Sequence, residues 1–225
     1  MEGPRFYAGI PRSSTMKIVA TVVDAGEAAL AAGLCPDLVE ARIDLMEVDP
    51  ARELPSIRLA FSGPVILTIR SVAEGGEFSG GPGAWWECLE PLLPFGDLID
   101  VETPCSSYSP RIRRLGKGII ASRHAEDMPA PAELRRLERE LRSYGDIPKI
   151  VVRPRNEHDL LDLLEFTLET ERPVCTGVLG DAYRFARVIL PLFGSELAYT
   201  HAGTCAAPGQ YALGDFKKIQ ALLGT

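Results

Sequence analysis

The five cysteines of this chain form no C-x-x-C pair. A zinc site built on paired thiolate ligands is therefore not indicated. An odd number of cysteines in a chain of 225 residues also argues against a disulfide framework. We expect reduced thiols and a cytoplasmic protein. The cysteines are Cys35, Cys88, Cys105, Cys175 and Cys205.

Long hydrophobic runs are also missing. No apolar stretch approaches the roughly 20 residues that a membrane-spanning helix needs. Residues 1–16 contain Pro, Gly and Ser but lack the apolar core of a secretory signal. We interpret them as a flexible N-terminal extension and expect one ordered domain over residues 17–225. The sequence predicts neither membrane attachment nor secretion.

Positive charge is scarce relative to negative charge. The chain has 24 Lys and Arg residues against 31 Asp and Glu residues, which gives a net charge of -7. A general nucleic-acid binder normally presents a basic surface, so we expect no nucleic-acid partner. An acidic chain can still contain a basic pocket, and anionic small molecules stay among the candidate substrates.

What the sequence does contain is a regular alternation of strand-like and helix-like segments from Lys17 onward. The expected strands are Lys17–Val23, Asp37–Asp44, Pro64–Arg70, Asp97–Glu102, Gly118–His124, Ile147–Arg153, Pro173–Val178 and Glu196–Thr200. The clearest helices expected between and after them are Ala25–Ala32, Pro131–Tyr144, Glu157–Glu169, Asp181–Phe193 and Tyr211–Leu223. In the second of these, Leu134, Leu137 and Leu141 recur at helical spacing.

Eight strand–helix units without an internal repeat predict an α/β fold with a single (β/α)8 TIM barrel. A hydrophobic content of 46% is enough for one substantial core. The alternative is a doubly wound open sheet. That fold normally has a Gly-rich phosphate turn after its first strand, and the segment from Val22 to Glu27 is not one.

Polar residues share one face of several expected strands. In the second strand, Val39 and Ala41 lie on one face while Glu40 and Arg42 lie on the other. The polar positions come late in their strands, as expected for a barrel interior that opens onto a site at the strand C-termini. The residues expected to converge there are Glu40, Arg42, Arg70, Glu102, His124 and Lys149.

Lys149 is the most informative of these residues. It lies within the apolar run Ile147–Val152, which is typical of a buried strand rather than a surface. Burial disfavours an ammonium, and a neutral lysine amine attacks carbonyl groups and forms Schiff bases. His124 ends the preceding strand and is a candidate proton carrier. The pair indicates carbonyl chemistry, although an isolated lysine in a strand is more often a surface residue.

Other polar residues allow two interpretations each. Arg42 could bind a ligand or form an ion pair with Glu40 inside the barrel. Arg70 precedes a loop with two glycines, which permits a tight turn beside a ligand. The segment 206–210 contains Pro and Gly and could be a lid or a plain turn.

Taken in order, several short motifs resemble the type I 3-dehydroquinate dehydratase family over Lys17–Leu223. The matching motifs are Glu40-Ala41-Arg42-Ile43-Asp44, Thr68-Ile69-Arg70, Glu74-Gly75-Gly76-Glu77, Asp100-Val101-Glu102, Ser122-Arg123-His124, Asp146-Ile147-Pro148-Lys149, Phe193-Gly194-Ser195 and Ala207-Pro208-Gly209-Gln210. The resemblance implies dehydration of 3-dehydroquinate in the shikimate pathway of aromatic amino-acid biosynthesis, with no metal or other cofactor. It also implies a homodimer.

The resemblance further implies roles for individual residues. Lys149 would form the imine with the substrate ketone, and His124 would be the general acid and base. The residues implied to bind the hydroxyl and carboxylate groups of the substrate are Glu40, Arg42, Arg70, Arg184 and Gln210. Glu74 would assist the histidine, and Thr21 would add a hydroxyl group.

The chain departs from the family pattern at Ala206, where relatives commonly have serine. A hydroxyl contact to the substrate is therefore missing, and Thr204 or Cys205 could replace it. Two other functions stay open on the sequence alone. One is a Schiff-base aldolase that acts on a sugar phosphate, and the other is a barrel without activity that serves as a binding partner.

Overall fold

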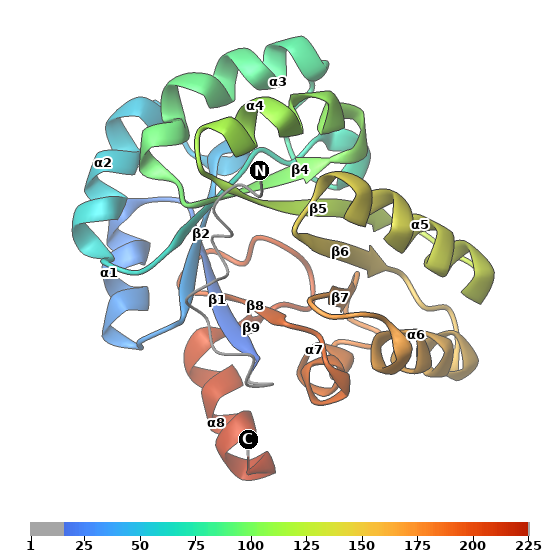
Figure 1. Cartoon of the computed structure of the whole chain (residues 1–225). Helices are drawn as coiled ribbons and strands as arrows, with labels where there is room; N and C mark the ends of the chain where they lie inside the picture. Colours follow the sequence, from blue (N-terminus) through green and yellow to red (C-terminus); the bar gives the residue numbers. More distant parts are fainter. Residues whose placement is uncertain (1–15, 225) are drawn as a thin grey trace.

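A computed structural model describes residues 16–224 as a single ring of strands with helices outside it (Figure 1). The predicted N-terminal extension lies almost wholly outside these residues. Eight strand–helix units follow one another, as the sequence predicted. Their bounds are β1 (Lys17–Val22), α1 (Ala25–Gly33), β2 (Leu38–Arg42), α2 (Pro50–Ala60), β3 (Val65–Thr68), α3 (Pro82–Leu89), β4 (Leu98–Glu102), α4 (Ser109–Arg114), β5 (Gly118–Ala125), α5 (Pro131–Tyr144), β6 (Ile147–Val152), α6 (Glu157–Glu169), β7 (Cys175–Val178), α7 (Ala186–Ile189), β8 (Leu197–His201) and α8 (Leu213–Leu223).

All strand pairs between the described residues are parallel, in the order β7-β6-β5-β4-β3-β2-β1-β8-β9, where β9 is the two-residue strand Tyr211–Ala212. The doubly wound alternative was therefore wrong, because β1 pairs with both β2 and β8 and the sheet curls round on itself. Each connection between consecutive strands from β1 to β8 contains a helix, which is the usual connection between parallel strands.

Ser195 closes the remaining gap between β7 and β8. Its Oγ accepts a hydrogen bond from the backbone N of Thr176 at 3.0 Å and lies 3.2 Å from the carbonyl oxygen of the same residue. Beside it, the backbone N of Glu196 donates to the carbonyl oxygen of Val174 at 2.8 Å. The buried hydroxyl of Ser195 thus connects β7 to the start of β8, where the other neighbouring strands are connected by backbone hydrogen bonds.

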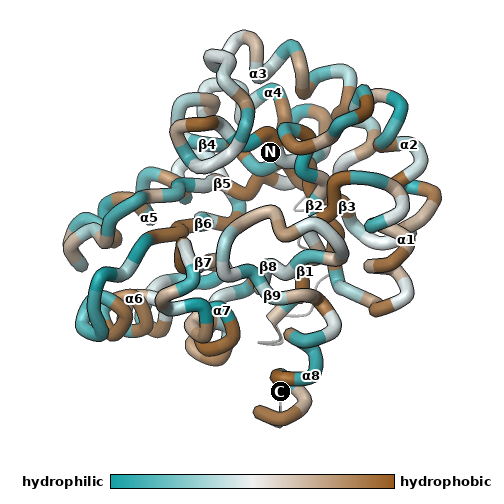
Figure 2. Tube along the Cα trace, turned by 180° about the vertical axis from the view of Figure 1, so that it is seen from behind, coloured by the Kyte–Doolittle hydropathy of each residue, from teal (hydrophilic) through white to brown (hydrophobic). Residues whose placement is uncertain are grey.

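The helices form where local signals start them. Asp24 accepts a hydrogen bond from the backbone N of Glu27 and caps α1, while Asn156 caps α6 through the backbone N of Asp159. In α5 the predicted leucine spacing is confirmed, because Leu134 and Leu141 are fully buried against the sheet. Figure 2 shows the contrast between brown stretches along β2 and β3 and the long teal stretches on the outer helices.

The predicted helix Asp181–Phe193 was wrong in its extent. Only Ala186–Ile189 is α-helical, and a 3₁₀ turn follows over Leu190–Phe193. Pro191 lacks the N–H that an α-helix would use at this point. The last helix begins at Leu213, two residues after the predicted start, because Tyr211–Ala212 extends the sheet beside β8.

The floor of the barrel is apolar. Inward side chains from alternate strands form layers in such a barrel, and the two lowest layers here contain only hydrophobic residues and one cysteine. Their buried members are Val19, Leu38, Ile66, Ile120, Ile147, Cys175 and Leu197. Within the described residues, Glu40, Asp100 and Lys149 of the inner face lie above this floor, toward the carboxyl ends of the strands, as the alternation in the sequence predicted.

Replacement of Ser195 by alanine is expected to lower the free energy of unfolding by about 1–3 kcal/mol, because the buried N–H of Thr176 loses its acceptor. Urea unfolding measures the change. Ser143→Ala is the matched control, since that hydroxyl lies on the exposed face of α5. Equal stability of the two variants would contradict a closing role for Ser195.

Candidate active site

The first polar layer of the barrel comes from the even-numbered strands. β2, β4, β6 and β8 contribute Glu40, Asp100, Lys149 and Tyr199 to it. Lys149 contacts the other three members. Its Nζ donates to Oδ2 of Asp100 at 3.1 Å, lies 3.8 Å from Oε1 of Glu40, and lies 4.0 Å from the ring centroid of Tyr199.

Lys149 is 4% exposed, as expected for a residue in a buried strand. The two carboxylates beside it were not part of the sequence argument, which considered burial alone. They attract a positive charge on the amine, so burial is opposed by ion pairing. The contacts to Asp100, Glu40 and Tyr199 hold the amine inside the cavity at the carboxyl ends of the strands.

Asp100 links Lys149 to Arg70. Oδ1 of Asp100 accepts hydrogen bonds from Nη2 of Arg70 and Oγ of Ser122, while Oδ2 accepts from Lys149. Burial raises the pKa of Asp100, but Arg70 and Lys149 lower it more, and the pKa is about 2. Asp100 is therefore an anion at neutral pH.

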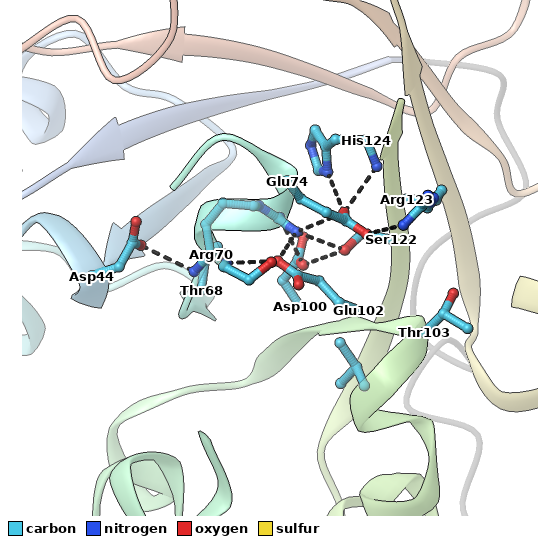
Figure 3. Close-up of polar contacts among 12 residues, drawn as sticks. Asp44, Thr68, Arg70, Glu74, Asp100, Glu102, Thr103, Ser122, Arg123 and His124 are labelled. Atoms are coloured by element: carbon cyan, nitrogen blue, oxygen red, sulfur yellow. Dashed lines mark hydrogen bonds and ion pairs between the residues drawn. The ribbon is translucent and has the colours of Figure 1, made fainter. Parts of the chain in front are cut away.

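The guanidinium of Arg70 lies at the centre of the contacts drawn in Figure 3. Its Nη1 donates to Oε1 of Glu102 at 2.8 Å and lies 3.6 Å from Oε2 of Glu74. Burial opposes the positive charge, but Asp100 and the other nearby carboxylates outweigh it and raise the pKa of Arg70 above its usual value. In the described structure, the guanidinium of Arg70 is paired with the carboxylates of Asp100, Glu102 and Glu74.

Glu74 connects this network to His124. Oε2 of Glu74 accepts from the backbone N of His124 at 2.9 Å and lies 3.0 Å from its Nδ1, and Oε1 accepts from Arg123 (Figure 3). Burial, followed by repulsion from Glu102, raises the pKa of Glu74 to about 7. Burial, followed by Arg70 and Lys149, holds the pKa of His124 well below its ordinary value.

These shifts give His124 the form of a general base. A neutral imidazole that donates from Nδ1 to Glu74 leaves Nε2 with a free lone pair. The carboxyl group behind it fixes the orientation of the ring. Glu74 was predicted to assist the histidine, and the structure places it in hydrogen-bond contact.

Glu40 is held by two hydroxyl groups, since Thr21 and Thr68 donate to its two oxygens at 2.7 and 2.9 Å. Nε2 of Gln210 donates to Oγ1 of Thr21 at 3.2 Å and to the carbonyl oxygen of Thr200 at 3.0 Å. Oε1 of Gln210 is buried and has no partner among residues 16–224. Gln210 lines the same cavity as Glu40 and Lys149.

Arg42 does not pair with Glu40, so that alternative was wrong. It forms two hydrogen bonds with Asp44, from Nε at 2.9 Å and from Nη2 at 2.7 Å. Asp44 follows two residues later in the chain, where the strand has ended and its carboxylate can turn back toward the guanidinium. Nη1 of Arg42 points to the carbonyl oxygen of Ala206 at 3.5 Å.

A cavity of about 90 Å³ joins these groups. Thr21, Glu40, Arg42, Arg70, His124, Lys149, Ala206 and Gln210 line it, which are the predicted site residues other than Glu74 and Arg184. Glu74 lies behind His124. Arg184 is exposed, and its guanidinium carbon lies 4.3 Å from the ring centroid of Tyr211.

Arg187 lines the cavity where Arg184 does not. Its Nη2 donates to the carbonyl oxygen of Pro208 at 3.2 Å, and its Nε is buried without a partner in the described part of the chain. Burial lowers the pKa of its guanidinium. Sequence reasoning missed this residue, which lies within the predicted segment Asp181–Phe193 between the buried residues Ala186 and Val188.

Two further residues of the site were missed. Asp100 stood in a quoted motif without a role, and Tyr199 was not singled out. The alternation in β4 and β8 places both on the inner face. Thr204 and Cys205, which could replace the missing serine hydroxyl, line a separate outer cavity of about 640 Å³ that shares Arg42 and Ala206 with the inner one.

Within residues 16–224, no group of three or more His, Cys, Asp or Glu side chains is arranged to hold a metal ion. In the same part of the chain, no helix combines the length and apolar character needed to cross a bilayer.

Comparison with known families gives a match over almost the whole described chain. The family model of type I 3-dehydroquinase matches residues 17–225. The 3-dehydroquinate dehydratase of Methanoregula boonei is 48% identical over 208 residues, which cover 92% of this chain and 100% of the relative. The enzyme of the same name from Methanospirillum hungatei is 39% identical, with 83% of this chain and 73% of the relative covered.

Solved structures agree with these matches. The type I 3-dehydroquinate dehydratase of Clostridium difficile superimposes with a TM-score of 0.82 at 28% identity, covering 94% of this chain and 93% of that one. The 3-dehydroquinate dehydratase of Geobacillus kaustophilus also gives a TM-score of 0.82, at 25% identity, with 93% and 91% covered. These findings favour the predicted dehydratase family over the aldolase alternative.

The ionisation of Glu74 should change stability with pH. Its pKa in the folded protein is about 7 against an ordinary value of 4.5, so the folded state binds this proton more tightly than the unfolded chain. Stability from this group is present below pH 4.5 and is lost as the pH rises through 7. Relative to Glu74→Gln, the unsubstituted protein is expected to lose about 2–3 kcal/mol between about pH 5 and about pH 8.

Urea unfolding of both proteins at the two pH values measures this difference. His124 contributes with the opposite sign in both proteins, and taking the difference between them reduces its influence. Glu165→Gln, at an exposed position on α6, controls for the loss of one negative charge. A pH-independent difference between the unsubstituted protein and Glu74→Gln would contradict the raised pKa.

Proposed function

The chain belongs to the type I 3-dehydroquinase family, and on this premise we propose that it dehydrates 3-dehydroquinate through an imine formed on Lys149. The product is 3-dehydroshikimate, and the reaction is a step of the shikimate pathway that leads to aromatic amino acids. The observation that supports this best is a buried lysine in one cavity with a histidine whose pKa is strongly lowered.

The neutral amine of Lys149 attacks the substrate ketone to give a carbinolamine, and a proton taken up from solvent on its hydroxyl group lets water leave as the protonated imine forms. The positive nitrogen withdraws electrons and acidifies the neighbouring carbon–hydrogen bond. Nε2 of His124 takes that proton, and the electron pair forms an enamine. The same imidazolium then gives its proton to the departing hydroxyl group, and water leaves as the iminium is restored. Hydrolysis of the imine releases the product and the amine.

The other cavity residues bind and orient the substrate in this proposal. Glu40 accepts hydrogen bonds from hydroxyl groups, and Arg42 and Gln210 contact polar groups at the mouth. Thr21 holds Glu40 and Gln210 in place through its Oγ1. Arg70 acts through the carboxylates that it holds, and Glu74 acts through the ring of His124.

We assign the substrate carboxylate to Arg187 rather than to Arg184. Arg187 lines the cavity with a free Nε, whereas Arg184 is exposed and stacks on Tyr211. Free Oε1 of Gln210 can accept a hydrogen bond from a nearby hydroxyl of the same molecule. The serine that relatives commonly have is Ala206 here, so its contact is absent from the proposed complex.

The family resemblance also supports a homodimer, and the odd number of scattered cysteines supports a cytoplasmic location; both stay predictions. Sedimentation equilibrium of the purified chain would test the first.

Borohydride in the presence of 3-dehydroquinate should reduce the imine and add the substrate skeleton to Lys149. Mass spectrometry of the peptides locates the adduct. Lys149→Ala should abolish turnover, followed as the absorbance of the conjugated enone, and should give no adduct. His124→Ala should turn over very slowly yet still be trapped. An unmodified Lys149 in active protein would refute the Schiff-base step.

Arg187→Ala is expected to lower kcat/KM by about 10- to 100-fold, because a charge-assisted hydrogen bond to the carboxylate is lost. Arg184→Ala is the matched control from the same segment and should stay within about threefold of the unsubstituted protein. Steady-state kinetics with 3-dehydroquinate measure both. A larger loss of kcat/KM with Arg184→Ala than with Arg187→Ala would indicate that Arg184 binds the carboxylate.

A further inference from the structure

Tyr199 completes the layer that holds Lys149. Its ring centroid lies 4.0 Å from Nζ, while the carboxylates of Asp100 and Glu40 contact the same nitrogen from other strands. An aromatic face at this distance attracts a cation through its quadrupole. The ring lines the cavity together with Lys149 and His124.

We propose that Tyr199 is a positioning residue for the reaction, whose ring face holds the nitrogen of Lys149 against Asp100 both as the ammonium and as the protonated imine. The inference rests on the proposed function, since it concerns the nitrogen on which the imine forms. It adds Tyr199, which had no predicted role, to the residues of the site.

The physical reason lies in the changing charge of the nitrogen. The nitrogen is positive in the resting ion pair, neutral when it attacks, positive again in the iminium and neutral in the enamine. A ring face attracts the two positive states without offering an acceptor that could compete for the proton. A third carboxylate in the same place would do the opposite, because it would add a proton acceptor and a buried negative charge.

The hydroxyl group of Tyr199 takes no part in this role. Its oxygen is buried and has no hydrogen-bond partner in the described residues. Burial, followed by repulsion from Glu40, raises the pKa of this phenol well above its ordinary value, so the phenol stays protonated. The ring rather than the hydroxyl is therefore the part that acts on Lys149.

Two substitutions separate the ring from the hydroxyl. Tyr199→Phe keeps the ring and should keep kcat within about threefold of the unsubstituted protein. Tyr199→Leu removes the ring face and is expected to lower kcat by about 10-fold. At saturating 3-dehydroquinate, the fraction of Lys149 trapped by borohydride should fall with Tyr199→Leu and stay high with Tyr199→Phe.

A graded series tests the electrostatic part while the shape is nearly constant. Phenylalanine at position 199 is replaced by its mono-, di- and trifluorinated forms, which weaken the negative face of the ring stepwise. The trapped fraction and kcat should decline in the same order, while urea unfolding shows unchanged stability. Equal values across the fluorinated series would overturn the proposal, as would a loss with Tyr199→Phe as large as with Tyr199→Leu.

The trapping assay on the unsubstituted protein distinguishes the two possible failures. If Lys149 is trapped there and the series is flat, the role of Tyr199 is wrong and the imine mechanism stands. If Lys149 is not trapped in the unsubstituted protein, the proposed function itself fails.

Discussion

The buried guanidinium of Arg70 is the contact on which the site depends. It is 4% exposed and joins three carboxylates from two places in the chain, namely Asp100 and Glu102 on β4 and Glu74 in the loop after β3. Loss of one partner from such a buried network leaves an uncompensated charge, which costs about 3–5 kcal/mol. The same network fixes Asp100 beside Lys149 and Glu74 beside His124. The two reacting groups are thus oriented through one shared cation.

The fold followed from the sequence because its signals are local. Strand alternation placed Glu40, Arg42 and Lys149 on the inner face, and the leucine spacing of α5 gave its bounds to the residue. The helices α2, α3 and α4 were less evident. Each has proline in its first turn, and α2 also contains an interior proline, so their apolar spacing is short and interrupted. Packing against the barrel, rather than intrinsic propensity, holds such helices.

Site residues on strands could be predicted from the sequence, and those on loops and short turns were harder to predict. Lys149 and His124 could be located because a strand has two faces and the inner face is determined. The side chains after β7 could not be located in this way. Arg184 and Arg187 are three residues apart, and only the turn before α7 decides which one faces the cavity. Asp100 and Tyr199 belong to a layer that becomes visible only when the barrel closes and brings β4 and β8 round to β6.

Backbone carbonyl groups of the loop before Gln210 contact Arg42 and Arg187, two of the arginines that line the cavity. Arg42 contacts the carbonyl oxygen of Ala206, and Arg187 donates to that of Pro208. These two carbonyl oxygens use hydrogen-bond donors that the proposed anionic ligand would also need. Ligand binding is then an exchange of one set of oxygen acceptors for another, and its net strength is a difference between two similar quantities. A change of sequence in this loop can therefore alter affinity without any contact to the ligand.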